Sequence, residues 1–460
     1  MTPFALNGGN ASSEASDGAV AYRIGFVLFI FALLLRIAAI EATGASVVRF
    51  GDGLDYLSAA RVICEEGSYP QRGSLPFFRA PGLPFFIAAV TACEPSRVRL
   101  IKYALAGSDA GTVVLIFLMA QFLWRRVASD PRFSAVPFLA AVLAAFQPLQ
   151  VAATTDIRTE PLFTFLLTLS MWLLLRRRPI LSGVAIALAS LVRPSALLCI
   201  PLFMLYLLWR PDLTASKRLE RAAPALAFLV AAILSLAPWT IRNAVHFGEL
   251  IVVNDAGGFS SWRGTHSELM ETVRTMDAAE FARRSVHFET VTVVEAARAV
   301  DARAATPGAR NREWKRMAWE NVRSDPGFAV RATFEKALMY WRPWLHPAEH
   351  GGPAMALSLM VSMTLFIGGA IGMAQYPDRR FVVAVLAFFA AMWLAHLPYI
   401  PTIRLRMPLV DPLLTVFTAG ALSAATVRLR KDWKAYLPLL LVFLPIVALA
   451  IVATQLADMP

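Results

Sequence analysis

Long runs of hydrophobic residues, separated by short polar connections, dominate the pattern along the chain. A helix needs about 20 predominantly apolar residues to cross the hydrocarbon core of a membrane, which is roughly 30 Å thick. Leu, Ala, Val, Ile and Phe fill runs such as 25–40, 136–151 and 437–453, without the alternation that β-barrel strands show. The pattern therefore predicts an all-α, polytopic membrane protein.

About eleven transmembrane helices are predicted. They are 22–42, 100–123, 134–153, 159–175, 179–193, 194–209, 222–241, 353–375, 380–397, 407–427 and 435–456. The chain then divides into a disordered cytoplasmic tail at 1–21, an N-terminal transmembrane module at 22–242 with an outer loop at 43–99, an extracytoplasmic domain at 243–352, and C-terminal transmembrane helices at 353–460. We expect the first span to stay in the mature protein, because it has no clear cleavage site of small residues.

Lys and Arg residues distinguish the two sides of the membrane. They gather in alternate connections, near 125–132, 176–178, 210–221, 379–380 and 428–434. Short loops rich in Lys and Arg stay on the cytoplasmic side. The outer side then carries the first loop, the turn at 154–161, the stretch 242–352 and the connection at 398–408.

Composition and charge add three expectations. The chain is 57% hydrophobic and only 17% charged, as a polytopic membrane protein requires. Its formal net charge of +12 comes mostly from the cytoplasmic loops, so we expect contact with membrane lipid and no nucleic-acid partner. Cys64, Cys93 and Cys199 are far apart and lack metal-ligand spacing, which predicts neither a disulfide framework nor a zinc site.

Ionisable residues on the outer side are the candidate functional residues, because such groups at a membrane boundary are costly unless they are paired or solvated. A positioned carboxylate can take a proton, and arginines can hold a phosphate. This mixture of groups predicts a site whose reaction needs both. The candidates are Asp52, Asp55, Arg79, Asp156, Arg158, Glu160, Arg193, Arg242, Arg404 and Arg406.

The first outer loop is predicted to contain two short helices. Apolar residues of 55–66 fall mostly on one side of a helix and charged residues on the other, which is typical of a helix lying on a membrane. Gly67 would end it, and 81–93 is too short to span, so it forms a second interfacial or re-entrant helix. Asp52 has two interpretations at this point, as the N-cap of the first helix or as a chemical group. A capping role for Asp52 does not exclude a chemical role.

Five segments of the chain carry a resemblance to a known family. They are GDGLDYLSAARVICEEGSYP with FFRAPGLPFF, TEPLFTFLLTL, SLVRPSALL, APWTIRNAVHFGELIVVNDAGGFSSWRGTH and RLRMPLVDPLL. In this order, from residue 52 to residue 414, they resemble the GT-C superfamily of membrane glycosyltransferases. The similarity is to the branch that contains protein O-mannosyltransferases and lipid A aminoarabinose transferases.

The resemblance implies an integral membrane glycosyltransferase that works by inversion. The donor would be a sugar on polyprenyl phosphate, and the acceptor a lipid, a polysaccharide or a protein. The implied location is a bacterial inner membrane, with the active site facing the periplasm or exterior, and we expect a monomer. No cofactor is implied with certainty; a divalent cation, Mg²⁺ or Mn²⁺, at the carboxylates stays open.

Roles carry over to the acidic positions that match the family's motifs. Asp52 matches the general base, with Asp55 as the alternative. Glu160 matches a second acidic position that orients the acceptor or a metal, although an acid in the first turn of a helix also favours the helix dipole. Tyr56 and Asp156 are weaker candidates for positioning the acceptor, and Asp156 could simply pair with the neighbouring arginine.

The arginines match the positions expected to hold the lipid phosphate. Arg79 and Arg242 are the first candidates, although Arg242 could instead anchor the chain at the interface beside a tryptophan. Arg193, Arg404 and Arg406 either bind phosphate or pair structurally with acidic residues such as Asp411 and Glu160.

Two other classes of protein remain. A transporter or flippase of lipid-linked or envelope glycans would also show many spans and buried charges, but the chain has no internal repeat and an outer segment of about 110 residues is unexpected for one. A non-catalytic assembly or sensor protein is the third hypothesis, after the glycosyltransferase and the transporter. Neither the sugar nor the acceptor can be identified from these residues.

Overall fold

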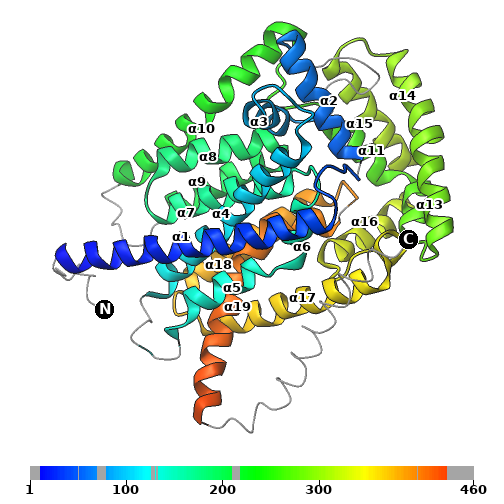
Figure 1. Cartoon of the computed structure of the whole chain (residues 1–460). Coiled ribbons are helices and arrows are strands. Elements are labelled where there is room, and N and C mark those ends of the chain that lie inside the picture. The colour runs from blue at the N-terminus through cyan, green and yellow to red at the C-terminus, as the bar shows by residue number, and fades with distance from the viewer. Residues whose placement is uncertain are drawn as a thin grey trace.

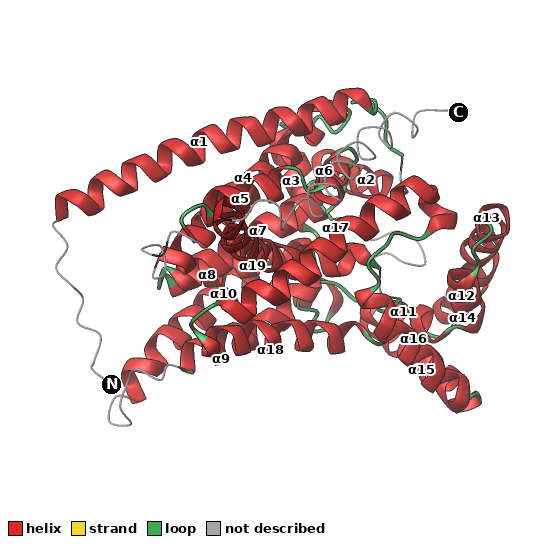
Figure 2. Ribbon diagram, turned by 90° about the horizontal axis from the view of Figure 1, so that it is seen from below, coloured by secondary structure: helices red, strands yellow, loops and turns green. Residues whose placement is uncertain are grey.

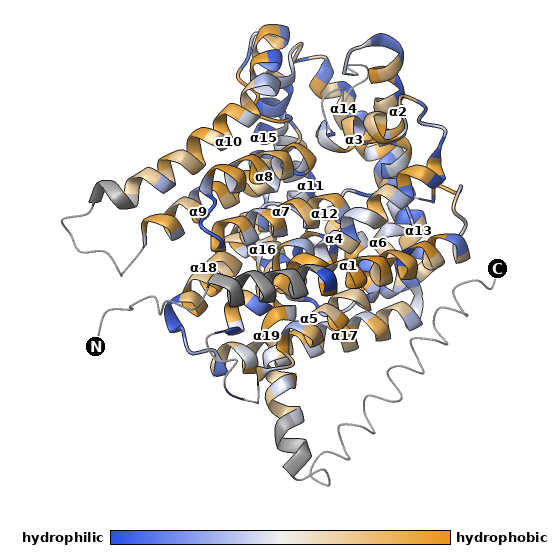
Figure 3. Cartoon of the chain, turned by 60° about the vertical axis from the view of Figure 1, so that its left-hand side comes forward, coloured by the Kyte–Doolittle hydropathy of each residue, from blue (hydrophilic) through white to orange (hydrophobic). Residues whose placement is uncertain are grey.

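The structure is a computed structural model that describes residues 11–49, 51–69, 79–125, 130, 133–209, 218–400 and 402–431. Within these ranges every regular element is a helix, which confirms the predicted all-α class. Long helices run alongside one another and short ones gather at one end of them (Figure 1). Hydrophobic residues predominate along the long helices in Figure 3. The chain is thus a multi-pass membrane protein.

The bundle is built from helices of unequal length. They are α1 (Ala11–Ala42), α4 (Val98–Trp124), α5 (Val136–Ala145), α6 (Pro148–Thr154), α7 (Glu160–Leu175), α8 (Pro179–Val192), η3 (Pro194–Leu198), α9 (Cys199–Leu208), α10 (Arg218–Phe247), α17 (Pro347–Gln375), α18 (Arg379–His396) and α19 (Ile403–Lys431). Helix α1 begins within the tail predicted to be disordered, and extending an existing helix costs less than starting a new one.

Six helices in the described ranges are long and apolar enough to span a membrane, or seven if the bent pair α5 and α6 forms one span. Three predicted spans, at 159–175, 179–193 and 194–209, correspond to shorter apolar helices. Helix α7 has 16 residues, and at 1.5 Å per residue such a helix is roughly 24 Å long. The span predicted at 435–456 lies outside the described residues, so the count of eleven stays a prediction.

Close approach of helix backbones holds the bundle together. A Cβ at Gly183 of α8 would lie 2.3 Å from the carbonyl oxygen of Phe228 on α10, and Gly372 of α17 lies as closely against Phe417 of α19. No side chain fits at either position. Small residues at such contacts are typical of membrane helices, whose association depends on tight packing.

Eight short helices lie on the side predicted to be outer. They are α2 (Gly51–Glu66), α3 (Gly82–Val90), α11 (Gly257–Thr265), α12 (Ser267–Arg274), α13 (Ala278–His287), α14 (Val293–Asp301), α15 (Pro307–Ser324) and α16 (Pro326–Trp341). Figure 2 shows α11 to α16 together at one end of the bundle. Phe259, Trp262, Phe288 and Trp314 form a separate small core among them. Their boundaries as a domain stay a prediction.

A disulfide between Cys64 and Cys93 corrects the expectation drawn from the cysteines. The two residues are 29 positions apart, but α2 packs against α3, which brings their Cα atoms to 5.3 Å. Such a pairing depends on how two helices fold back on each other, which cysteine spacing does not reveal. The disulfide ties the end of α2 to the end of α3.

Candidate functional site

The first outer helix supplies two carboxylates that converge on one arginine. Asp52 lies in the first turn of α2 and Asp55 follows one turn later, on the same side. The Arg79 guanidinium donates to Asp52 at 2.7 Å and to Asp55 at 2.7 Å and 3.1 Å. Its plane lies over the ring of buried Tyr56, with 5.3 Å between the guanidinium carbon and the ring centroid. The Tyr56 ring and the Arg79 guanidinium therefore form a cation–π contact.

Two further arginines extend this group into the bundle. Arg404, at the start of α19, donates to Glu160 at 2.5 Å and lies 3.5 Å from the other oxygen of Asp52. Arg193, at the end of α8, lies 3.1 Å from Glu160 and donates to the hydroxyl of Thr159 at 2.6 Å. The side chain of Glu160 is 0% exposed, whereas that of Asp52 is 35% exposed. We call Asp52, Asp55, Arg79, Glu160, Arg193 and Arg404 the outer charged cluster.

The environment of Asp52 keeps it ionised. Burial raises the pKa of its carboxyl, but the positive charges of Arg79 and Arg404 outweigh that effect and hold the pKa below its ordinary value of 3.8. A proton acceptor near neutral pH has to be deprotonated, and Asp52 is. Because it is partly exposed, it can also be reached from outside.

Two other predicted residues make their contacts outside the cluster. Asp156 is buried in the turn before α7, where its carboxylate accepts from the backbone NH groups of Ile157 and Arg49. Arg242, near the end of α10, lies over the ring of Trp239, as an interfacial anchor would. The structure does not bring either residue to the carboxylates of α2.

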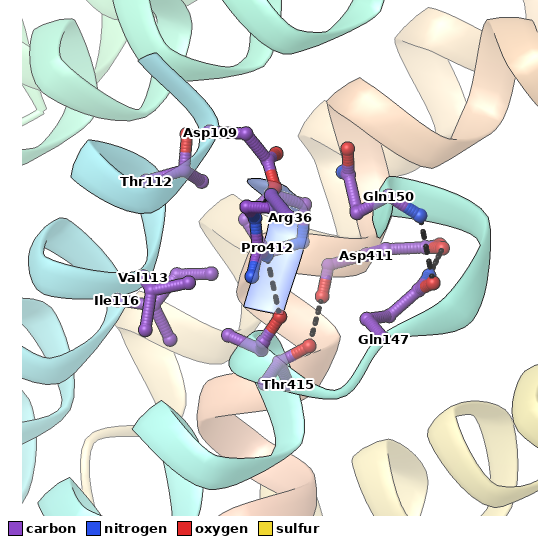
Figure 4. A pocket seen from close by; sticks show the side chains of 11 residues that line it. Arg36, Asp109, Thr112, Val113, Ile116, Gln147, Gln150, Asp411, Pro412 and Thr415 are labelled. Carbon is purple, nitrogen blue, oxygen red and sulfur yellow. Dashed lines mark hydrogen bonds and ion pairs between the residues drawn. The ribbon is translucent and has the colours of Figure 1, made fainter. Parts of the chain in front are cut away.

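Arg406 belongs to a separate buried group inside the bundle. Its Nε atom lies 3.6 Å from Asp411, and both side chains are almost fully buried. Asp411 also accepts from Gln147 at 3.3 Å. Beside Asp411 and Gln147, Arg36 of α1 donates to Asp109 of α4 at 2.5 Å. Figure 4 shows Arg36, Asp109, Gln147 and Asp411 around one small cavity. Arg36 and Asp109 are not among the residues predicted from the sequence, although each is a charge inside an apolar helix, which is the signal that marks such residues.

The motif Trp-Thr-x-x-Asn near the end of α10 has a clear structural role. Trp239, Thr240 and Asn243 donate to the carbonyl oxygens of Val253, Val252 and Ile251 at 2.7 Å, 3.1 Å and 2.9 Å. Side chains of the helix thus hold the extended segment that leads to the outer helices. Part of the family resemblance in this region therefore comes from residues that hold the fold together, not from residues that would react.

The carboxylates of the outer charged cluster are already paired with arginines, which bears on metal binding. Asp52, Asp55 and Glu160 each have an arginine partner within 3.1 Å. In the described part of the chain, no three His, Cys, Asp or Glu side chains are arranged to hold a metal. A divalent cation would have to displace these arginines, so its presence stays open as a prediction.

Comparisons with known proteins identify the fold. The family model of the GPI transamidase subunit PIG-U matches residues 61–249, and no curated protein sequence matches the chain. Archaeal oligosaccharyltransferase AglB from Archaeoglobus fulgidus, in complex with an inhibitory peptide and a dolichol-phosphate, superposes with a TM-score of 0.54 at 13% identity, over 94% of this chain and 56% of that one. The apo form of the Archaeoglobus fulgidus oligosaccharyltransferase superposes with a TM-score of 0.55 at 13% identity, over 94% of this chain and 55% of that one.

A third structure, ArnT from Cupriavidus metallidurans bound to undecaprenyl phosphate, superposes with a TM-score of 0.38 at 14% identity, over 87% of this chain and 77% of that one. The chain spans about half the length of AglB. Its fold is the GT-C fold of these structures, which confirms the predicted fold.

Proposed function

We propose that the chain is an inverting glycosyltransferase that moves a sugar from a polyprenyl phosphate to an acceptor on the outer face of the membrane. The observation that carries this proposal is the outer charged cluster, in which Asp52 lies between Arg79 and Arg404. Base and cations are the two kinds of group that such a transfer requires. The dolichol-phosphate in the AglB complex, a protein of the same fold, supports the choice of donor.

The reaction follows from the ion pairs of Asp52. The phosphate of the donor competes with Asp52 for Arg79 and Arg404, since guanidinium groups bind phosphate oxygens well. Once the arginines hold phosphate, burial of the Asp52 carboxyl is less compensated and its basicity rises. Asp52 then takes the proton of the acceptor hydroxyl as that oxygen attacks the sugar carbon. The bond to phosphate breaks, and the arginines stabilise the charge on the departing lipid phosphate.

Glu160 acts by holding cations in place. Its buried carboxylate contacts Arg193 and Arg404 on α8 and α19, so it fixes the position of Arg404 beside Asp52. We assign Arg79 and Arg404 to the phosphate and give Arg193 a supporting role. The roles predicted for Arg242, Arg406 and Asp156 have no support in the geometry.

The predicted orientation is also part of this proposal. The Cys64–Cys93 disulfide supports an outer location for α2, because disulfides persist in oxidising compartments such as the periplasm. A bacterial inner membrane and a monomeric state stay predictions.

The test is substitution Asp52→Asn, which keeps the shape of the side chain and removes its basicity. Membranes that contain the variant are incubated with a panel of synthetic polyprenyl-phosphate hexoses and pentoses, and transfer to endogenous glycolipid is measured. We expect the rate to fall by about 10² to 10⁴-fold, the contribution of a general base. Asp55→Asn, on the same helix and with the same arginine partner, is the matched control.

A small loss in Asp52→Asn with a large loss in Asp55→Asn would transfer the role of base to Asp55. Full activity in both variants, at unchanged expression and membrane insertion, would refute the proposed reaction. Saturable movement of glycolipid across liposomes without transfer would favour a flippase.

A second candidate function is a subunit that holds a lipid-linked glycan for another protein. The match of 61–249 to a GPI transamidase subunit favours it, and this matched region excludes Asp52 and Asp55. In that case the wild-type protein makes no product from any donor in the panel.

A further inference from the structure

A second cavity, with a volume of about 500 Å³, lies between the bundle and the outer helices. Ligand pockets in proteins commonly measure about 300 to 1,000 Å³. One wall is apolar and includes Pro194 and Leu197, at the junction of α8 and α9. Its polar lining residues include Asp255, Asn311 and Arg312.

This cavity adjoins the outer charged cluster on two sides. Pro194 directly follows Arg193, a member of the cluster. Ile251, another lining residue, packs against Tyr69, whose hydroxyl donates to the Arg79 carbonyl at 2.9 Å. The cavity is thus connected to the cluster at Arg193 and through Tyr69, and its lining does not include the ion pairs of the cluster.

The backbone along the cavity is unsuited to a peptide. An extended peptide is normally recognised by hydrogen bonds to the edge of an extended segment. Here the carbonyl oxygens of residues 251–253 already accept from three side chains of α10. Recognition in this cavity thus depends on its side chains.

The charges around the cavity are unsuited to phosphate. Glu249 and Asp255 both line it. Glu249 accepts from the backbone NH of Gly308 at 2.6 Å and lies 3.3 Å from Arg312, so this arginine is already paired with a carboxylate. Arg310, whose charge also acts on Asp255, forms its own ion pair with Asp301 at 2.9 Å. A phosphate here would face two carboxylates.

Neutral hydroxyl groups suit these side chains well. A carboxylate accepts from hydroxyls, whereas a guanidinium and an amide NH2 group donate to them. The amide oxygen of Asn311 already accepts from the backbone NH of Gly258 at 2.6 Å, so this side chain would offer its NH2 group. Burial raises the pKa of Asp255 to about 6, so its carboxyl is mostly ionised at neutral pH and accepts there. The aliphatic wall can cover the apolar face of a ring at the same time.

We propose that this cavity binds the carbohydrate part of the acceptor, a neutral sugar unit whose hydroxyl groups face Asp255, Asn311 and Arg312. The inference rests on the proposed function and narrows its acceptor to a molecule that already carries a sugar. The lipid or polysaccharide that bears this sugar extends outside the cavity.

The test measures binding directly through a thiol introduced by Val252→Cys, at a partly exposed position that lines the cavity. Labelling with maleimide is selective for this site, because Cys64 and Cys93 are bonded and Cys199 is buried. The full chain in lipid nanodiscs is labelled with and without a panel of neutral methyl glycosides. We expect at least one glycoside to slow labelling several-fold, and inorganic phosphate and a hexapeptide to leave it unchanged.

Two further variants sharpen the result. Met276→Cys, at an exposed outer position that does not line the cavity, should be labelled equally with and without glycoside. Adding Asp255→Asn to Val252→Cys should raise the glycoside concentration for half-protection about tenfold, as loss of a hydrogen bond to a charged group predicts. Equal protection with and without Asp255→Asn would overturn the role given to Asp255.

Labelling that no glycoside slows, or that only phosphate or peptide slows, overturns the proposal. That failure is distinguishable from failure of the proposed function. If Asp52→Asn abolishes transfer but glycosides give no protection, only the acceptor site is wrong. If glycosides protect the thiol but Asp52→Asn transfers sugar at full rate, the proposed reaction is wrong.

Discussion

Asp52 and Asp55 lie one helical turn apart, yet they are not equivalent. The side chain of Asp55 is 56% exposed and contacts Arg79, whereas Asp52 contacts both Arg79 and Arg404 and is more buried. A ligand that binds these arginines therefore changes the surroundings of Asp52 more than those of Asp55. Local sequence offered capping as an alternative for Asp52, but α2 already begins at Gly51 and the Asp52 carboxylate points to arginines. The surroundings favour Asp52 as the base.

The pH dependence of transfer should separate the free and the donor-bound states of Asp52. A base works only when it is deprotonated, so activity falls as pH falls through its pKa. In the free protein that pKa lies below 3.8, and kcat/KM, which reports the free enzyme, should stay level down to about pH 4. Phosphate bound to the arginines removes part of their effect, so kcat should begin to fall at a higher pH.

Rates for wild type between pH 3.5 and 8 check this expectation. Asp55→Asn should leave the order of the two acid limbs unchanged, since its effect reaches Asp52 only through Arg79. Coincident limbs for kcat and kcat/KM would mean that the donor does not compete for the arginines of Asp52.

At the scale of elements, what could be predicted followed from local pattern. Hydropathy located the helices, and Asp325-Pro326, a dipeptide typical of a helix boundary, separates α15 from α16, with Asp325 capping α16. Helix phase could not be predicted in the same way. Arg404 and Arg406 are two residues apart, about 200° on a helix, so they point to opposite sides. One reaches Glu160 and the other Asp411, and only packing decides which.

The disulfide between α2 and α3 should stabilise the part of the chain that carries Asp52. Closing a loop of this length restricts the unfolded chain and contributes about 2 to 4 kcal/mol. We expect Cys64→Ser to lower the Tm and to slow transfer, because α2 is then less fixed against Arg79. Dithiothreitol should have the same effect on wild type, measured by thermal melting in detergent.

Reductant should leave the Tm of Cys64→Ser unchanged, which makes that variant its own control. Alkylation of the unfolded wild-type chain without reductant should modify one cysteine, Cys199. Three modified cysteines and a Tm that is insensitive to reductant would show that the bond does not form.

At the scale of the whole molecule, charged residues fall into two groups that differ in access to water. The outer charged cluster is partly exposed, so a ligand can rearrange its ion pairs. Arg36 and Asp109, by contrast, are 0% and 1% exposed and tie α1 to α4. Arg36 also donates to the carbonyl oxygens of Ala144 and Ala145 on α5. A pair that no substrate can reach serves the assembly of the bundle.

Breaking this buried pair should cost far more than removing it. Arg36→Met leaves the carboxylate of Asp109 buried without its partner, which destabilises a protein by about 3 to 5 kcal/mol. The double variant Arg36→Met/Asp109→Ala removes both charges and should recover much of that loss, measured as the free energy of unfolding in detergent micelles. The coupling between the two substitutions should exceed about 1 kcal/mol, as for residues in direct contact. Strictly additive losses would mean that the two side chains do not interact inside the bundle.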